Sequence, residues 1–325
     1  MKKQIIFMYS GQGSQYYHMG KELYENSVRF KFWMDHCDKI VHPLIETSII
    51  DVLYRGQGKR DPFDRILHTN PALLSIKYSL SRVIMEMGIQ PDYLLGYSLG
   101  EITAAIVSGA LSLEEGLQLA VGKAKLVEQK SQLAEMLAIV ESPEIMSEFP
   151  ELFQNCWITG KNFKNNFVVS GLPKDIQYLR EGLKEKNKIS QILPVKYGFH
   201  TELIDSIEEE YKELVRKLNP AAIGIPIISS LKNERIQEVN VDYFWEVIRH
   251  PVDFEKTIDW VLKLGDFVFI DVGPSGSLAT FVKYILPANS ESLSLQMLNQ
   301  FGKDLNSLEK LRTSLPVTTM GTVSP

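Results

Sequence analysis

Apolar and polar positions in the first third of the chain follow two different periods. The run IIFMYS (residues 5–10) is almost wholly apolar, as a buried strand is, and the turn GQGSQ and a helix near residues 20–24 follow it. In PALLSIKYSLSRVIMEMG (71–88) apolar residues recur at helical spacing between Pro71 and Gly88. PDYLLGYSLGEITAAIVSGAL (91–111) has the pattern of a strand, a sharp turn and a helix of small residues. Strands alternating with helices predict a parallel sheet covered on both faces.

The middle of the chain has a different order of elements. Short strands are predicted at 136–140, twice within WITGKNFKNNFVVSG (157–171) and at 190–195, with helices at 142–153 and 173–187. Ser142 is a suitable cap for the first of these helices. The order β-α-β-β-α-β is that of the ferredoxin-like unit. We therefore predict an inserted lobe at residues 128–197.

The alternation of strand and helix returns after Pro220. IPIISS (225–230) and DFVFIDVGPSG (266–276) are predicted strands, and residues 241–264 form a helical segment broken at Pro251. Residues 313–325 have no periodicity and are predicted to be a loose tail. Residues 1–127 and 198–312 then form one parallel-sheet core around the inserted lobe.

Composition narrows the class of protein. The 325 residues suit one large domain with an insertion, or two domains, and 44% hydrophobic residues can form a sizeable core. A net charge of −5 gives no support for nucleic-acid binding. Cys37 and Cys156 fit neither a metal spacing nor a disulfide framework. No apolar run is long enough for a secretion signal or for the roughly 20 residues of a membrane span. We expect a cytoplasmic monomer without a membrane segment.

The stretch LLGYSLGE (94–101) contains the spacing Gly-x-Ser-x-Gly. A predicted strand precedes Ser98 and a predicted helix follows it, which is the context of a nucleophile elbow. At such a helix N-terminus the amide of Leu99 can face a developing oxyanion. The alternative is an ordinary glycine-rich turn. The context favours a nucleophilic serine.

A serine hydroxyl needs a base within hydrogen-bond reach. Four of the six histidines precede the elbow in regions that read as helix or loop. His200 follows the last predicted strand of the inserted lobe, at a hinge that can face a cleft between the two parts. His250 lies beside the predicted helix break and is the other possibility. The pattern favours His200, with a buried structural histidine as the competing interpretation.

Several spaced motifs together resemble one family. GQGSQ, HTNPALL, GYSLGE, KNFKNNFVVSG, LPVKYGFH and FIDVGPSGSL extend to about residue 286 and are similar to motifs of the malonyl-CoA:acyl-carrier-protein transacylases, which include acyltransferases of polyketide assembly lines. The resemblance implies an α/β-hydrolase-like parallel-sheet core with an inserted ferredoxin-like small subdomain. It implies an acyl-accepting Ser98, its base His200, and an oxyanion hole formed by Gln12 and Leu99.

The resemblance also implies the surroundings of these residues. A backbone carbonyl near residues 247–250, assigned to Val247, orients the histidine, so that no acidic residue need complete a triad. Asn70 stands where the family commonly has a glutamine that faces the pocket. Asn162 and Phe199 are expected to line the pocket. Phenylalanine at position 199 often accompanies malonyl use in the family.

Two positions depart from the family pattern. Tyr97 replaces the usual histidine before the nucleophile, and Lys123 replaces an arginine that clamps the malonyl carboxylate. An ammonium is a point charge and lacks the bidentate fork of a guanidinium. Losing the fork removes about 1.5–3 kcal/mol, or roughly ten- to hundredfold in preference for malonyl. Alternatively, Lys123 is a solvated helix residue in a pocket never built for dicarboxylates.

These departures, together with Ser10 where transacylases usually have proline, resemble the stand-alone acyl hydrolases of trans-acyltransferase polyketide pathways. The implied activity is hydrolysis of non-malonyl acyl groups on carrier proteins, with a transacylase that loads extender units as the alternative. A generic esterase, which needs an acid serving His200, and a non-catalytic scaffold remain open.

The implied substrate arm is phosphopantetheine, and no bound cofactor or metal is expected. The implied partner is an acidic acyl carrier protein. Five lysines of the inserted lobe are candidates for its docking, or are merely solvated helix ends: Lys161, Lys164, Lys184, Lys186 and Lys188.

Overall fold

The larger part of the molecule is built on a six-stranded sheet. The structure, a computed structural model, describes residues 3–315. The strand order is β11-β10-β1-β2-β7-β8, and every pairing is parallel except that of β7 with β8. The strands are β1 (Gln4–Tyr9), β2 (Tyr93–Gly96), β7 (Ile227–Ser229), β8 (Glu234–Arg235), β10 (Phe267–Asp271) and β11 (Leu293–Gln296). The predicted α/β class with a parallel sheet is therefore confirmed.

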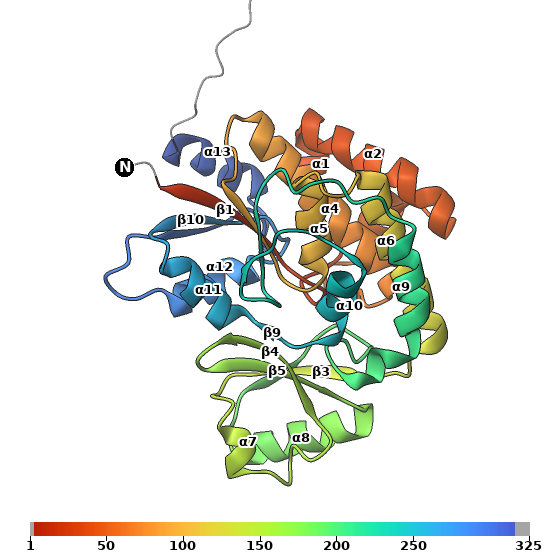
Figure 1. Cartoon of the computed structure of the whole chain (residues 1–325), viewed down its shortest axis with the longest axis vertical. Helices are drawn as coiled ribbons and strands as arrows, with labels where there is room; N and C mark the ends of the chain where they lie inside the picture. Colours follow the sequence, from red (N-terminus) through yellow and green to blue (C-terminus); the bar gives the residue numbers. More distant parts are fainter. Residues whose placement is uncertain (1–2, 316–325) are drawn as a thin grey trace, which may run out of the picture.

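Helices cover both faces of this sheet (Figure 1). They are α1 (Lys21–Asn26), α2 (Val28–Ile45), α3 (Ile49–Tyr54), α4 (Ile66–Glu86), α5 (Leu99–Val107), α6 (Leu113–Lys130), η1 (Glu202–Ile207), α9 (Glu208–Arg216), α10 (Val241–Arg249), α11 (Phe254–Leu262), α12 (Ser277–Ile285) and α13 (Asp304–Ser314). Side chains alternate along β1, because successive residues of a strand point to opposite faces. Phe7 and Tyr9 join the core that contains α4, α5 and α6, whereas Ile6 and Met8 join the core of α11 and α12.

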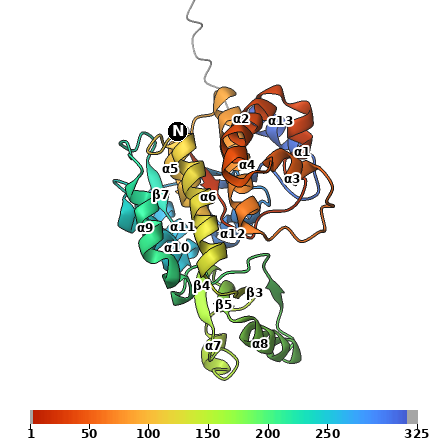
Figure 2. The same cartoon turned by 90° about the vertical axis from the view of Figure 1, so that its right-hand side faces the viewer.

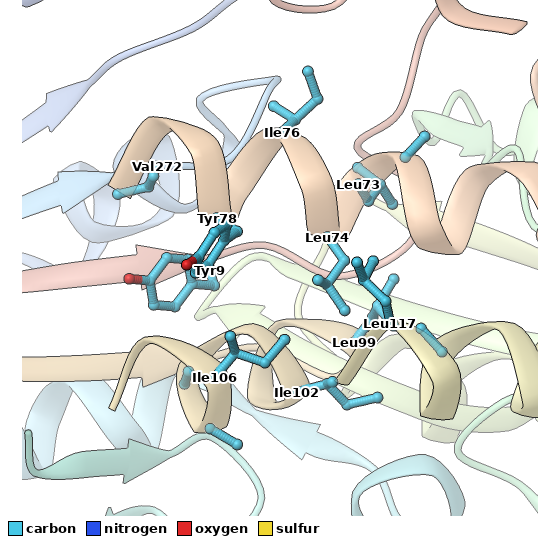
Figure 3. Close-up of a cluster of buried hydrophobic side chains, with 14 of the residues drawn as sticks. Tyr9, Leu73, Leu74, Ile76, Tyr78, Leu99, Ile102, Ile106, Leu117 and Val272 are labelled. Carbon is cyan, nitrogen blue, oxygen red and sulfur yellow. The ribbon is translucent and has the colours of Figure 1, made fainter. Parts of the chain in front are cut away.

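The helix α4 lies in the middle of the larger core. Sixteen of its 21 residues are buried, and they lie on all sides of the helix, which is the pattern of an enclosed helix. Figure 3 shows Leu74 of α4 pointing toward Leu99 and Ile102 of α5, which belong to the same buried cluster. This packing fixes the helix that follows the predicted elbow.

A second sheet forms a small lobe at one end of the molecule (Figures 1 and 2). Its strands β3 (Glu135–Ile139), β4 (Trp157–Phe163), β5 (Asn166–Gly171) and β6 (Ser190–Ile192) run antiparallel in the order β6-β3-β5-β4, with α7 (Ile145–Glu148) and α8 (Pro173–Glu185) on one face. This is the predicted ferredoxin-like unit. A short strand of the core, β9 (Val252–Asp253), pairs parallel with β4 and extends the sheet.

Several boundaries differ from the sequence prediction. The predicted helix at 142–153 contains only the four residues of α7, because Pro150 disfavours helical backbone at Phe149 before it. The helix expected to begin at Pro71 begins at Ile66 and runs through the proline. The predicted tail begins two residues too early, since α13 ends at Ser314. The rest of that tail, residues 316–325, lies outside the described residues.

No helix within residues 3–315 is long and apolar enough to cross a membrane.

Candidate active site

Ser98 lies at a sharp turn between β2 and α5. Its backbone has φ 53° and ψ −116°, a strained conformation for a residue other than glycine. The turn needs glycine on each side: a Cβ at Gly96 would lie 2.6 Å from the nitrogen of Glu101, and one at Gly100 would overlap the carbonyl oxygen of Tyr9. Strain concentrated on a serine at a strand-to-helix turn is the geometry of a nucleophile elbow.

His200 meets this serine from a loop that follows the small lobe. Its Nε2 lies 2.8 Å from Ser98 Oγ, and its Nδ1 lies 2.8 Å from the carbonyl oxygen of His250. A carbonyl only accepts, so Nδ1 carries the proton and Nε2 is free to accept from the serine hydroxyl. Of the two histidines considered from sequence, the structure places His200 beside Ser98.

The assignment of Val247 as the orienting carbonyl is wrong by three residues. α10 ends at Arg249, and His250 already has extended backbone (φ −100°, ψ 150°) because Pro251 follows. The carbonyl of His250 therefore leaves the helix and faces His200. The side chain of Val247 is buried in the core.

Burial controls the protonation of His200. The side chain is 6% exposed, and burial lowers its pKa to about 4. The His250 carbonyl acts against this effect, while the positive charge of Lys123 adds to it. At neutral pH the imidazole is therefore uncharged, which is the form that a base requires.

The loop after β1 lies directly against Ser98. A Cβ at Gly11 would lie 3.2 Å from the Cβ of Ser98, so the next residue, Gln12, is close to the nucleophile. Leu99 opens α5 on the other side. The two residues predicted to form the oxyanion hole thus flank the serine.

Two adjoining cavities lie between the core and the small lobe. The inner cavity has a volume of about 60 Å³ and contains Ser98, His200, Leu99 and Lys123 in its walls. The outer cavity has a volume of about 260 Å³. Its polar wall consists mainly of amide and hydroxyl side chains: Asn162, Asn166, Gln191, Ser275 and Ser277. Gln12 and Tyr97 line both cavities, so the outer cavity adjoins the one that contains Ser98.

Tyr97 and Asn162 join the core to the small lobe. The Tyr97 hydroxyl donates to Asn162 Oδ1 at 2.9 Å, and Asn162 Nδ2 donates to Asn166 Oδ1 at 2.7 Å. Gly160 makes room for the phenol, since a Cβ there would lie 2.6 Å from the Tyr97 hydroxyl oxygen. Tyr97 and Asn162 therefore both lie in the wall of the outer cavity, where they bond to each other.

Lys123 is buried and is not a solvated helix residue. It is 2% exposed, and its Nζ lies 5.4 Å from the ring centre of Phe199. Burial lowers its pKa to about 7. Lys123 and Phe199 both line the inner cavity.

Asn70 differs from its predicted place. It lines neither of the two cavities, and its side chain is fully buried on α4 with no hydrogen-bond partner for either amide atom among residues 3–315. The family commonly has glutamine at this position, and the side chain of asparagine is one methylene shorter.

Sequence reasoning missed three residues near the site. Glu101 is buried and accepts hydrogen bonds from the Ser229 hydroxyl and the Ser230 amide at 2.9 Å and from the Tyr243 hydroxyl at 2.6 Å. Burial raises its pKa to about 7 despite these bonds. Glu101 could have been noticed in the sequence, because it is the one charged residue in a predicted helix of small and apolar residues. The other two missed residues are Asn166 and Lys77, a buried lysine on α4. Nothing in the sequence around them indicated a place near the site.

Within residues 3–315, no group of three or more His, Cys, Asp or Glu side chains is arranged to hold a metal ion.

Comparison with known proteins identifies the family. The acyl transferase domain family matches residues 6–325, and the chain belongs to this family. This confirms the resemblance drawn from the spaced motifs.

The relatives with similar sequences include two Bacillus proteins. The chain is 40% identical to the polyketide biosynthesis acyltransferase homolog PksD of Bacillus subtilis, over 96% of this chain and 98% of that protein. It is 36% identical to the acyltransferase homolog BaeD of Bacillus velezensis, over 97% and 98%.

Solved structures share the fold. A loading acyltransferase of the avermectin polyketide synthase has a TM-score of 0.87 at 23% identity, covering 95% of this chain and 99% of that one. The malonyl CoA-acyl carrier protein transacylase of Clostridium perfringens has a TM-score of 0.78 at 24% identity, with 96% of both chains covered.

Proposed function

We propose that this protein takes acyl groups from carrier-protein thioesters through an acyl-Ser98 intermediate and hydrolyses them. The observation that carries the proposal is the hydrogen-bonded relay from Ser98 through His200 to the His250 carbonyl, 2.8 Å at each step. A nucleophile, its base and a group that orients the base are the parts of an activated serine. Membership of the acyl transferase family supports acyl chemistry at this relay.

The first half-reaction forms the acyl-enzyme. His200 Nε2 takes the proton of Ser98 Oγ as the oxygen attacks the thioester carbonyl carbon. The backbone amides of Gln12 and Leu99 hold the tetrahedral oxyanion. When the carbon–sulfur bond breaks, the imidazolium returns its proton to the leaving thiolate, and an ester remains on Ser98.

The second half-reaction releases the acyl group. His200 removes a proton from water, which attacks the ester carbonyl, and then protonates Ser98 Oγ as the carbon–oxygen bond breaks. The products are a carboxylic acid and the free serine. A second thiol in place of water gives transfer, so the relay serves either outcome.

The outer cavity suits the phosphopantetheine arm of a carrier protein. That arm contains two amide groups, and Asn162, Asn166 and Gln191 supply donors and acceptors for them. Among the candidate docking lysines, Lys188 pairs with Glu141 and Lys186 lies over the ring of Phe149. Lys161 and Lys164 are exposed beside the cavity residue Asn162 and are the better candidates for meeting an acidic carrier protein.

Lys123 supports a preference for non-malonyl acyl groups. A buried amine with a pKa of about 7 is only partly charged at neutral pH, and it lacks the fork that holds a carboxylate bidentately. The inner cavity is small and is lined by Met136, Val195 and Phe199 in addition to the amine. These features favour short, uncharged acyl groups.

A transacylase that loads acyl units remains the second candidate. Phe199 in the pocket favours it, because this residue often accompanies malonyl use in similar proteins. A generic esterase is less well supported, since the orienting group of His200 is the His250 carbonyl and not a carboxylate.

The deciding experiment offers the pure protein acetyl- and malonyl-loaded carrier protein, with and without free coenzyme A. Mass spectrometry follows the mass of Ser98 and the products. We expect acetate release without coenzyme A, an acetyl adduct on Ser98, and much slower use of malonyl. Acetyl-coenzyme A as the main product would establish the transferase instead.

Two variants complete the test. Ser98→Ala removes the nucleophile, and Ser79→Ala is the matched control because it removes a buried hydroxyl that has no hydrogen-bond partner among residues 3–315. Acyl release by Ser98→Ala at the unmodified rate would refute the mechanism.

A further inference from the structure

A buried amine outside the proposed relay contacts the loop that holds Gln12. Lys77 lies on α4 with none of its surface exposed, and its Nζ donates to the carbonyl oxygen of Ser10 at 2.7 Å. Ser10 is the first residue after β1. Burying an amine costs free energy unless the amine is hydrogen-bonded. Packing alone therefore does not account for a lysine at this position.

Two hydroxyl groups bind the same loop. Ser14 Oγ donates to the carbonyl of Gly11 at 2.7 Å, and Ser10 Oγ donates to Ser14 Oγ at 3.0 Å. A peptide unit is planar and trans, so its N–H points opposite to its carbonyl. Fixing the Gly11 carbonyl therefore fixes the direction of the Gln12 N–H, and fixing the Ser10 carbonyl fixes the peptide plane before it.

We propose that Lys77 is a positioning residue for the oxyanion hole: it holds the Ser10–Gly11 peptide and, through the Ser10 and Ser14 hydroxyls, the Gln12 amide against Ser98. This inference rests on the proposed function, in which the Gln12 amide binds the oxyanion. Lys77 lines neither cavity, and it acts only through the loop.

The surroundings of the loop leave it little freedom. Gly11 lies against Ser98 on one side, and on the other a Cβ at Gly273 would overlap the Ser10 hydroxyl. Ser10 is therefore confined between Lys77 and the turn after β10. Asp271 at the end of β10 attracts the amine and Lys123 on α6 repels it, while burial lowers its pKa to about 7. The amine remains a hydrogen-bond donor in either protonation state.

The competing interpretation is that Lys77 merely satisfies a buried carbonyl. That role affects stability and the amount of folded enzyme. It does not change how the enzyme discriminates between substrates whose reacting atoms differ. A comparison of two substrates on the same enzyme sample therefore separates the two roles.

The test uses acetyl pantetheine thioester and its dithioester analogue, in which sulfur replaces the carbonyl oxygen. Sulfur is a weak hydrogen-bond acceptor, so its reaction depends less on the oxyanion hole. For Lys77→Met we expect kcat on the thioester to fall about 10- to 100-fold with little change in KM, because misplacing an oxyanion donor acts in the transition state. The kcat/KM ratio of thioester to dithioester should fall by about tenfold.

Controls make each outcome decisive. Ser79→Ala, on the same helix, should keep the unmodified ratio, and Lys77→Gln, which retains a donor, should give a ratio between those of the unmodified and Met proteins. The ratio does not depend on the concentration of active enzyme, so it can be measured even if Lys77→Met folds poorly. An unmodified ratio in Lys77→Met overturns the inference while leaving the proposed function intact. Acyl release by Ser98→Ala at the rate of the unmodified enzyme overturns the proposed function itself.

Discussion

At the scale of single residues, His200 is a base whose surroundings oppose its charged form. Burial and the neighbouring Lys123 lower its pKa to about 4, and the His250 carbonyl acts in the opposite direction by stabilising the imidazolium. A carboxylate in place of that carbonyl would compensate the positive charge. We therefore expect His200 to carry the extra proton only while a tetrahedral intermediate is present, and to be neutral in the resting enzyme and in the acyl-enzyme.

The pH profile should report this environment. We expect kcat/KM for acetyl pantetheine to be level from about pH 8 down to about pH 5, with an acidic limb near pH 4 instead of the roughly 6.5 of an unperturbed histidine. Lys123→Met removes the positive neighbour and should move the limb upward. A limb between about pH 6 and 7 in the unmodified enzyme would contradict this description of His200.

Lys123 is the residue through which acyl preference can be changed. Lys123→Arg supplies a planar fork and a permanent charge, and we expect the kcat/KM ratio of malonyl to acetyl to rise by about tenfold. Competition between the two loaded carrier proteins measures this ratio. Lys123→Met, which removes the charge, should not raise it. No gain in Lys123→Arg would show that position 123 does not select the acyl group.

At the scale of elements, the sequence predicted best where periodicity and short-range turn chemistry agree. The elbow, the ferredoxin-like unit and the helix break at Pro251 are local patterns, and the structure has each of them. The helix α2 was missed although its buried residues Phe30, Met34, Cys37, Val41 and Ile45 recur at helical spacing. The starting residue of α4 was missed because proline is usually read as the first residue of a helix.

Contacts between residues far apart in the chain were harder to predict from the sequence. That Ser98 and His200 meet followed from the motif and the hinge, but the carbonyl that orients His200 depends on where α10 ends, which sequence patterns fix only to within a few residues. The burial of Lys123 and the contact of Lys77 with Ser10 depend on the packing of α4 and α6, which no local pattern contains.

The contact between β4 and the elbow gives a test at this scale. Gly160→Ala places a methyl group against the Tyr97 hydroxyl and should lower turnover by about tenfold, because the elbow residue next to Ser98 must shift. Tyr97→Phe removes that hydroxyl, so the double variant should recover most of the loss. Thermal melts and kcat of the four proteins form a double-mutant cycle. Equal losses in Gly160→Ala with and without Tyr97→Phe would contradict the contact.

At the scale of the whole molecule, the site depends on both parts of the chain. Ser98, Gln12 and Lys123 belong to the core, whereas Asn162, Asn166 and Gln191 come from the small lobe. The two cavities exist only where these parts face each other. Substrate access and the relay are therefore coupled to the packing of the small lobe on the core.

Burial of a lysine near the site should reduce the stability of the whole fold at neutral pH. The folded pKa of Lys123, about 7, lies below that of the unfolded chain, about 10.5, so the unfolded state binds the proton more strongly and stability falls as the pH drops from 10 towards 7. Lys123→Met should therefore raise Tm by about 2–5 °C at pH 7, with the gain shrinking towards pH 10. Exposed Lys125→Met is the matched control. A gain that is constant with pH would contradict the linkage.

The pairing of β9 with β4 affects whether the small lobe can be excised or exchanged between homologous proteins. Two core residues, Val252 and Asp253, supply the edge strand next to β4 in the small-lobe sheet. A fragment containing only residues 128–197 would leave one side of β4 without its hydrogen-bonding neighbour, and bare strand edges invite self-association. Exchanging that fragment between homologues keeps the edge covered by the recipient, so chimeras should be more soluble than the excised piece.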